Sequence, residues 1–382
     1  MIIQSTHVWI GGDFMPLQIQ IEDRTITAIY TYNEKPVDID YKDEWILPGF
    51  IDIHCHGAYG YDTNEATPDG LKNWAKNIVN EGVTGFLATT VTDDKETLLK
   101  AVKNVSDVKK EHIAGNDGAD ILGIHFEGPY LDKQYKGAQP EEAIVSPSVD
   151  EFKEYQEAAN GLIKVMTIAP EHDKDFSLTK YASTHDCVVS IGHSSCTYEE
   201  AHLAIANGAS SITHTYNGQT PFNHRENGIV GIALRLRNVY SEIICDTYHS
   251  TKEALNIFFQ SKGSHYGIMI SDSLLCKGGK PHEVFQFGAN TVELSDEGTA
   301  YIQGTNTLSG STMRMCDGLK NLITKANVPL EAAINSCTLN PATLLKLDDH
   351  IGKIQAGYDA DLVVLDKDFE VTQTFAKGQT QK

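Results

Sequence analysis

The residues of this 382-residue chain that could do chemistry are histidines and acidic residues that follow short apolar runs. His54 and His56 end the first run, and side chains two residues apart on a strand point to the same side. Imidazole and carboxylate ligands suit Zn²⁺, Fe²⁺, Co²⁺ or Mn²⁺. A carboxylate can bridge two such ions, and the pair of ions lowers the pKa of a bound water so that hydroxide is available near neutral pH. The sequence therefore predicts a metal centre for hydrolysis, with the ligands His54, His56, Glu127, His193, His214 and Asp272.

Each of these residues also has a simpler structural explanation. A single histidine at the end of a strand is more often solvated than bound to a metal, Glu127 could cap a helix, and Asp272 fits the N-cap position of a helix. The metal interpretation rests on their conjunction at corresponding positions of five runs. Cys55 lies between His54 and His56, but strand alternation turns it away, so we expect a core thiol there.

The apolar runs and the segments between them predict how these residues are positioned. The segments have helical periodicity and often end in glycine, so each run is expected to be a buried strand followed by a helix. Eight such units predict an α/β protein with a closed (β/α)₈ barrel, whose chemistry lies at the C-terminal ends of its strands. Counting alone leaves a doubly wound sheet open. The expected strands are Trp45–Ile53, Thr84–Thr90, Ile121–His125, Ile163–Ile168, Val188–Ile191, Ser211–Thr213, Ile243–Cys245 and Gly267–Ile270.

Both chain ends predict short strands outside the barrel. Residues 2–10, 17–21 and 24–30 near the start, and 361–365 and 370–375 near the end, are strand-like and broken by turn residues. Neither end alone could bury a core. We therefore expect one small β-sandwich domain formed by residues 1–46 and 347–382, with the catalytic barrel at residues 47–346.

Composition limits the partners and the location of the protein. A formal net charge of −21 argues against non-specific binding to nucleic acid or to anionic membranes. Seven widely spaced cysteines without a C-x-x-C pair do not form a disulfide framework, which favours a reducing cytoplasm. No signal peptide or membrane span is expected. An anionic small substrate remains compatible with a local cationic pocket.

The segments around these residues resemble a known superfamily. LPGFIDIHCHG and GKIQAGYDADLVVLD resemble the opening and closing motifs of the amidohydrolase superfamily. A narrower resemblance is to the family of N-acetylglucosamine-6-phosphate deacetylases, through GIHFEGPYLDKQYKGAQP, SIGHSSCTYEEA, ITHTYNGQTPFNHRENGIVG, CDTYHS, ISDSL and TLSGSTM. These motifs occur in the family's order, and the resemblance covers nearly the whole chain.

The resemblance implies a reaction and the residues that catalyse it. Glu127, His193 and His214 match the family's metal ligands, and Asp272 matches its general base and acid. His249 matches a residue near the amide and the sugar. The implied reaction is hydrolytic deacetylation of N-acetylglucosamine 6-phosphate to glucosamine 6-phosphate and acetate, by a metal-bound hydroxide, in amino-sugar catabolism. Because this chain keeps the H-x-H pair that some members have lost, two ions are expected, Zn²⁺ or Fe²⁺, with Co²⁺ or Mn²⁺ as alternatives.

The resemblance also implies how a phosphorylated amino sugar is bound. Asn217 and Gly218 match the pair that holds the sugar phosphate, and Arg225 matches an arginine that reaches the phosphate from the neighbouring subunit of a homodimer. The chain has Y-N-G-Q where the family has Y-N-A-M, and K-G-A-Q where some members have K-G-A-H. Gln139 is thus a neutral donor in place of a possible cation. The other substrate-binding residues implied are Ala138, His249, Leu308, Ser309 and Gly310.

Two other functions compete with this interpretation. Another amidohydrolase, such as a cyclic-amide hydrolase or a D-amino-acid deacylase, would share the barrel and the ligands. Many cyclic-amide hydrolases bridge their metals with a carboxylated lysine on strand 4, but run 4 here ends Ile168-Ala169-Pro170-Glu171, with no lysine at that end. A catalytically dead scaffold is the second alternative, and the intact ligands and Asp272 argue against it.

Overall fold

Eight parallel strands form one sheet in the computed structural model, which describes residues 1–288 and 290–381. Their order along the sheet follows their order along the chain, whereas a doubly wound sheet reverses direction. The backbone N–H of Asp272 donates to the carbonyl of His54 at 2.9 Å, which brings the last strand back to the first and nearly closes a barrel. The predicted α/β barrel is therefore confirmed. Its strands are β6 (Phe50–Cys55), β9 (Val83–Thr90), β10 (Asp120–Glu127), β11 (Ile163–Ile168), β12 (Val188–Ile191), β13 (Ala209–Ile212), β14 (Tyr240–Ile244) and β15 (Gly267–Ile270).

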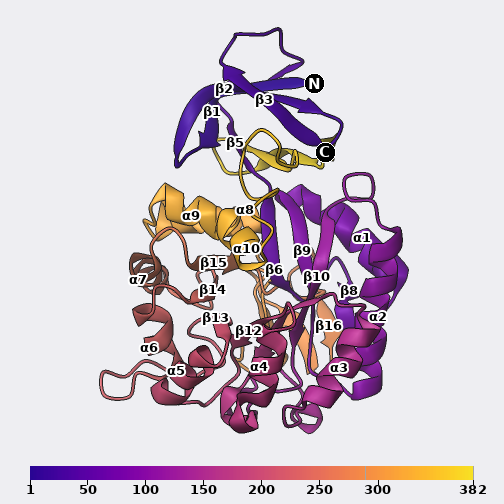
Figure 1. Ribbon diagram of the computed structural model, residues 1–382, viewed down its shortest axis with the longest axis vertical. Helices are drawn as coiled ribbons and strands as arrows, with labels where there is room; N and C mark the ends of the chain where they lie inside the picture. Colours follow the sequence, from indigo (N-terminus) through magenta and orange to yellow (C-terminus); the bar gives the residue numbers. More distant parts are fainter. Residues whose placement is uncertain (289, 382) are drawn as a thin grey trace.

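Helices surround the barrel strands (Figure 1). Several begin at side chains that cap exposed backbone N–H groups: Asp94 accepts from the N–H of Thr97, and Thr197 and Glu200 form a capping box. Among the described residues, no helix combines the length and the apolar character needed to cross a membrane. The helices are α1 (Pro68–Ile78), α2 (Lys95–Glu111), α3 (Val149–Ala158), α4 (Ser177–Ser183), α5 (Tyr198–Ala206), α6 (Gly228–Arg235), α7 (Lys252–Lys262), α8 (Met315–Lys320), α9 (Leu330–Ser336) and α10 (Leu339–Leu344).

Strands from both chain ends share a second sheet, as predicted. It lies beside one end of the barrel, at the top of Figure 1. Apolar side chains from both ends of the chain, Ile3, Val8 and Ile19 with Leu362 and Phe375, form its core. The residue boundaries proposed above for the two domains stay a prediction. The strands are β1 (Ile2–Ile10), β2 (Asp13–Glu22), β3 (Thr25–Thr31), β4 (Ile39–Asp40), β5 (Trp45–Pro48), β19 (Leu362–Leu365), β20 (Val371–Ala376) and β21 (Gln379–Thr380).

The run Trp45–Ile53 is not one strand, which corrects the expectation from the sequence. Gly49 separates β5, which pairs with β1 and β19 in the end sheet, from β6, which pairs with β9 in the barrel. A Cβ atom at Gly49 would lie 2.2 Å from the side chain of Thr84. The glycine therefore lets the chain pass between the two sheets at close contact.

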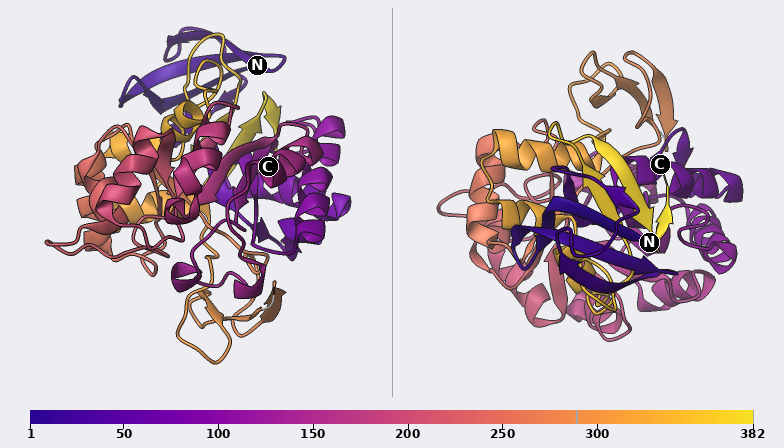
Figure 2. Two further views of the ribbon diagram at one scale, coloured as in Figure 1. Left: turned by 60° about the horizontal axis from the view of Figure 1, so that its bottom comes forward. Right: turned by 90° about the horizontal axis from the view of Figure 1, so that it is seen from above.

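A three-stranded sheet, inserted after β15, is an element that the sequence did not predict. It consists of β16 (Val284–Phe287), β17 (Asn290–Leu294) and β18 (Ala300–Ile302), and it lies at the opposite end of the barrel from the end sheet (Figure 2). Val284 and Gln286 on its first strand are exposed, so this strand lacks the continuous buried run that marks a barrel strand. Phe287 on β16 lies over the barrel mouth, with its ring centroid 5.7 Å from that of His56.

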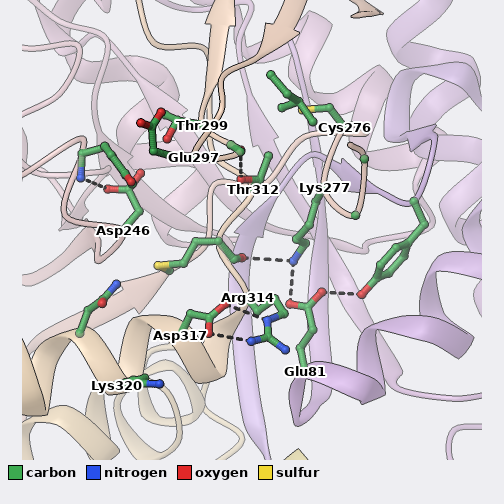
Figure 3. Close-up of a pocket in the computed structure, with 18 of the residues that line it drawn as sticks. Glu81, Asp246, Cys276, Lys277, Glu297, Thr299, Thr312, Arg314, Asp317 and Lys320 are labelled. Carbon is green, nitrogen blue, oxygen red and sulfur yellow. Dashed lines mark hydrogen bonds and ion pairs between the residues drawn. The ribbon is translucent and has the colours of Figure 1, made fainter. Parts of the chain in front are cut away.

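A buried ion pair connects the loop after β15 to the segment before β9. The ammonium of Lys277 lies 2.8 Å from a carboxylate oxygen of Glu81, and both side chains are 2% exposed (Figure 3). Asp52 is also buried there, and Ser271 donates to it at 2.5 Å. Burial opposes the charge on Lys277, but Glu81 and Asp52 outweigh it and raise the pKa of Lys277 above its usual value. The charge of Lys277 thus compensates two buried carboxylates, one of which, Asp52, lies on the same strand as His54.

Replacement of Lys277 should therefore destabilise the fold. Lys277→Met keeps most of the side-chain volume but leaves Glu81 buried without its cation, which costs about 3–5 kcal/mol of the free energy of unfolding. Lys72→Met is the matched control, because the Lys72–Glu111 pair is 44% and 76% exposed and should contribute less than about 1 kcal/mol. Urea denaturation measures both. Equal losses in the two variants would show that burial does not decide the effect.

Candidate metal centre and substrate cavity

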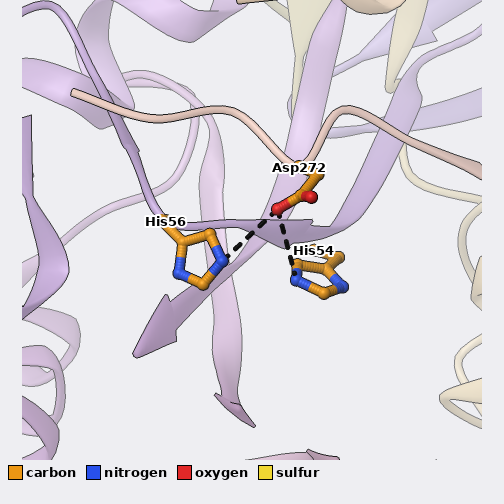
Figure 4. A group of neighbouring side chains, drawn as sticks. All are labelled: His54, His56 and Asp272. Carbon is orange, nitrogen blue, oxygen red and sulfur yellow. Dashed lines mark ion pairs between the residues drawn. The ribbon is translucent and has the colours of Figure 1, made fainter. Parts of the chain in front are cut away.

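The first group of predicted ligands lies at the junction of the first and last barrel strands. His54 and His56 come from the end of β6, and Asp272 follows β15 (Figure 4). One oxygen of Asp272, Oδ1, lies 3.5 Å from Nε2 of His54 and 3.3 Å from Nε2 of His56. The three side chains are thus close enough to share one ion.

The second group of predicted ligands lies at the ends of β10, β12 and β13. Oε1 of Glu127 is 3.3 Å from Nε2 of His193 and 3.1 Å from Nε2 of His214. The two imidazole Nε2 atoms are themselves 3.1 Å apart. These three residues also converge closely enough to hold an ion.

Glu127 lies between the two groups. Its Oε1 atom is 3.4 Å from Nε2 of His54, and its Oε2 atom is 3.2 Å from Nε2 of His56. One carboxylate therefore faces histidines of both groups, which is the arrangement of a ligand shared by two ions. The structure brings together all six predicted ligands.

Hydrogen bonds behind the imidazole rings orient them for metal binding. Nδ1 of His193 lies 2.8 Å from the carbonyl of Tyr135, and Nδ1 of His214 lies 3.1 Å from the carbonyl of Asn217. Nδ1 of His54 lies 2.9 Å from the carboxylate of Glu242. Each partner can only accept, so Nδ1 carries the proton, and Nε2 of a neutral ring directs a lone pair at the centre.

This donor set fits a divalent cation. The lone pairs of His193 and His214 face each other and Glu127, and Nε2 of the fully buried His54 has no hydrogen-bond partner. A buried set of acceptors without donors is unfavourable unless a cation lies among them. The residues present therefore match the metal requirement that the sequence predicts.

Without ions, the same groups can reach neutrality only by binding protons. Burial opposes the charge on His56, but hydrogen bonds with Asp272 and Glu127 raise its pKa to about 9. Burial likewise opposes ionisation of Asp272, but His56 and His54 lower its pKa to about 2. Burial also opposes ionisation of Glu127, but the nearby His54 and His193 hold its pKa well below the usual range. Protons and metal ions therefore compete for the centre.

Three of the predicted ligands have an unfavourable backbone conformation. The φ angles are +46° at His193, +26° at His214 and +50° at Asp272, in the left-handed region that non-glycine residues rarely adopt. Such a conformation costs about 1–3 kcal/mol at each residue and persists where the surroundings enforce it, most often at functional sites. The turns after β12, β13 and β15 thus direct these side chains into the barrel mouth at the expense of local stability.

A cavity of about 270 Å³ opens above the two groups. Most of the predicted substrate-binding residues line it. Asn217 is among them, and its Nδ2 atom is buried without a hydrogen-bond partner. Ser309 is fully buried and does not appear among the lining residues, so its predicted contact stays a prediction. The predicted residues that line the cavity are Ala138, Gln139, Asn217, Gly218, His249, Leu308 and Gly310, beside His56, Glu127, His193, His214 and Asp272.

His249 is held at the cavity wall by Asp246. Nδ1 of His249 lies 2.6 Å from Oδ2 of Asp246, and Oδ1 of Asp246 accepts the backbone N–H groups of Tyr248 and His249. Burial opposes the charge on His249, but Asp246 outweighs it and raises its pKa. Asp246 also borders a separate cavity of about 530 Å³, the one drawn in Figure 3.

Arg225 lies apart from this cavity within the chain. It is exposed in the segment between β13 and α6 and lines a neighbouring groove with Tyr135 and Asn227. Among the described residues that line the substrate cavity, none is lysine or arginine. Histidines are therefore the only side chains of the described wall that can carry a positive charge.

Two buried carboxylates that support the site were not singled out from the sequence. Glu242 on β14 orients His54, and Asp246 orients His249. A glutamate within the apolar strand YSEII, and an aspartate three residues before a histidine, were the available signals. His125 shares the pocket of His54 and Glu242, but both of its ring nitrogens are hydrogen-bonded, to Ile53 and Thr167, so it is no ligand.

The barrel and the paired ligand groups are those of a metal-dependent hydrolase, and comparison with known proteins identifies the class. Residues 45–380 match the amidohydrolase family, and the chain belongs to that family.

Relatives narrow the comparison to sugar-phosphate deacetylases. The chain is 37% identical over 364 residues to N-acetylglucosamine-6-phosphate deacetylase of Bacillus subtilis (strain 168), covering 94% of this chain and 91% of that protein. It is 30% identical over 363 residues to N-acetylgalactosamine-6-phosphate deacetylase of Escherichia coli O157:H7, covering 95% and 94%. The structure of a mutant N-acetyl-D-glucosamine-6-phosphate deacetylase from Mycobacterium smegmatis, in complex with N-acetyl-D-glucosamine-6-phosphate, superposes with a TM-score of 0.93 at 27% identity, covering 100% and 99% of the two chains.

Metal binding at this centre should release protons. His56 has a pKa of about 9 without ions, so at pH 7 it carries a proton that an ion must displace. The affinity for Zn²⁺ should consequently rise as the pH increases toward 9 and fall as the pH decreases. Calorimetric titration in buffers of different ionisation enthalpy measures the released protons. The double variant His54→Asn, His56→Asn should release fewer, and heats that do not depend on the buffer would contradict the competition.

Proposed function

We propose that this chain hydrolyses N-acetylglucosamine 6-phosphate to glucosamine 6-phosphate and acetate, as part of amino-sugar catabolism. One observation carries the proposal: four buried histidines lie within 3.4 Å of Glu127 beneath a cavity that Asp272 and His249 also line. The relatives that act on N-acetylated sugar phosphates supply the substrate class. The chain also matches N-acetylgalactosamine-6-phosphate deacetylase, whose substrate differs in the configuration at C4 of the sugar. The preference for one of the two sugars is therefore tested by experiment.

We propose two divalent ions per chain, Zn²⁺ or Fe²⁺, with Co²⁺ or Mn²⁺ as alternatives. His54, His56 and Asp272 would hold one, His193 and His214 the other, and Glu127 would serve both. Such ions polarise a carbonyl group and make hydroxide available near neutral pH. The distances of 3.1–3.5 Å between these donor atoms support the assignment.

Asp272 is the proposed general base and acid. Its low pKa keeps it ionised at neutral pH, so it can take the proton of the attacking water. It then delivers that proton to the amine as the C–N bond breaks. His249 is proposed to donate a hydrogen bond to the acetyl carbonyl, and Asp246 holds its ring in position.

The phosphate group is proposed to lie at Asn217 and Gly218. Asn217 offers a free amide donor, and Ala138, Leu308 and Gly310 would enclose the sugar. Because the described lining of the cavity lacks lysine and arginine, a dianion needs a cation from elsewhere. We propose that Arg225 of the partner subunit in a homodimer supplies it, since a guanidinium binds phosphate through two parallel hydrogen bonds.

Other features agree with this assignment. Strand β11 carries Lys164, but its ammonium lies 2.9 Å from the exposed carboxylate of Asp186. Glu127, which faces both groups of histidines, would take the bridging position of a carboxylated lysine. The convergence of all six predicted ligands argues against a catalytically dead scaffold.

The cysteines are free and buried, which supports the proposed cytoplasmic location. We also retain the division into a barrel at residues 47–346 and one small domain from the two ends.

Acetate release tests the proposed reaction. The metal-loaded protein should release acetate from N-acetylglucosamine 6-phosphate at least about tenfold more efficiently than from the unphosphorylated sugar, because remote binding energy positions the amide. Asp272→Asn should lower kcat by about 10²–10⁴. N-acetylgalactosamine 6-phosphate is the matched substrate control. No acetate from either phosphorylated sugar would disprove the proposed function.

Mixing two variants that are each impaired on the phosphorylated sugar tests the role of Arg225. Arg225→Ala should raise KM for the phosphorylated sugar and leave the rate on the unphosphorylated sugar nearly unchanged. A mixed dimer of Arg225→Ala with Asp272→Asn contains one site with an intact Asp272 and an Arg225 from the other chain, so activity should reappear after subunit exchange. Lys is no substitute for the planar donor pair, so Arg225→Lys should resemble Arg225→Ala. Exchange without recovery would show that Arg225 does not act across subunits.

A further inference from the structure

The side chain of Gln139 connects Glu127 to the loop after β9. Nε2 of Gln139 lies 2.8 Å from Oε2 of Glu127, and Oε1 of Gln139 lies 2.8 Å from the backbone nitrogen of Thr92. Gln139 is 5% exposed. The side chain is thus held at both ends of its amide.

These contacts fix which way the amide points. The backbone N–H of Thr92 can only donate, so the amide oxygen must face it, and the NH₂ group must then face Glu127. One N–H of Gln139 is committed to Glu127 and the oxygen is committed to Thr92. Little hydrogen-bonding capacity is left for a substrate.

The bond from Gln139 restricts the rotation of the carboxylate on which both ligand groups depend. Oε1 of Glu127 faces His193 and His214 and also lies 3.4 Å from Nε2 of His54, whereas Oε2 faces His56. Gln139 donates to Oε2 and thereby keeps this oxygen turned toward His56. A carboxylate that rotated freely could direct both oxygens at one ion and leave the other with fewer ligands.

The loop that carries Gln139 is itself held in place. The carbonyl of Tyr135 accepts from Nδ1 of His193, the ammonium of Lys136 lies 3.3 Å from the carbonyl of Gln139, and Nδ2 of Asn290 on β17 donates to the carbonyl of Ala138 at 2.6 Å. Residues 135–139 therefore orient two ligands, His193 through the backbone and Glu127 through the Gln139 side chain.

We propose that Gln139 is a positioning residue for Glu127, which maintains the ion site at His54 and His56, and that it is not a substrate ligand. This inference rests on the two ions of the proposed function. It differs from the role that the resemblance implied for this position, where Gln139 would contact the sugar phosphate. The proposal predicts a specific pattern. Loss of the amide should lower the affinity for one of the two ions and leave the affinity for the substrate unchanged.

The test replaces the amide and follows both metal affinity and kinetics. Gln139→Met keeps the length of the side chain without a donor, and Gln139→Asn keeps the amide but is one methylene too short to reach both partners. Gln134→Met, at an exposed position of the same loop, is the matched control. Competition with a zinc chelator gives the two dissociation constants for Zn²⁺, thermal unfolding of the metal-free forms tests the fold, and KM and kcat are measured with and without excess Zn²⁺.

Both Gln139 variants should raise one dissociation constant by about 10–100-fold, the usual effect of losing a hydrogen bond to a metal ligand, and the other by less than about threefold. KM should stay within about twofold, and excess Zn²⁺ should restore most of kcat. Unchanged metal affinities, or an increase in KM that excess Zn²⁺ does not reverse, would overturn the proposal. A large loss of stability of the metal-free protein, together with an equal loss of affinity for both ions, would also overturn it. The zinc affinities need no substrate, so they decide this inference even if no deacetylation is found.

Discussion

The carboxylate of Glu127 is the group on which the rest of the site depends. It is 1% exposed and lies within 3.4 Å of imidazole nitrogens from four histidines. A buried carboxylate is costly unless positive charge compensates it, and the histidines supply that charge either as protonated rings or through ions that they bind. Protons and metal ions therefore compete for the same histidines, and the protonation state of the site determines how readily it can bind the ions that the proposed catalysis needs.

The barrel satisfies this constraint by making several strands end at one point. Two of the predicted ligands lie at the end of β6, and the other four each lie at or just after the end of a different strand. Three of them have a left-handed backbone conformation. Groups behind the ligands, such as Glu242 and the carbonyl of Tyr135, orient the rings. The backbone conformation of these turns thus destabilises the fold locally, and the apolar core around the strands stabilises it.

The sequence predicted the barrel, the end sheet and the six converging ligands, because periodicity and strand-end position are local properties of the chain. It did not predict the break at Gly49, since the need for a glycine there comes from Thr84, a distant residue. Nor did it reveal that Glu242 faces His54 or that Gln139 donates to Glu127. Glu242 and His54 are far apart in the chain, and the contact between Gln139 and Glu127 depends on how the loop between them folds back, so no periodic pattern records either contact.

The most direct measurement is X-ray diffraction from crystals grown with Zn²⁺, with data collected at the zinc absorption edge. The account predicts two anomalous peaks roughly 3.5–4 Å apart, one near His54 and His56 and one near His193 and His214, with an oxygen of Glu127 directed at each. A single peak at full occupancy, or two peaks with Glu127 turned away from either, would contradict the claim that this carboxylate serves two ions.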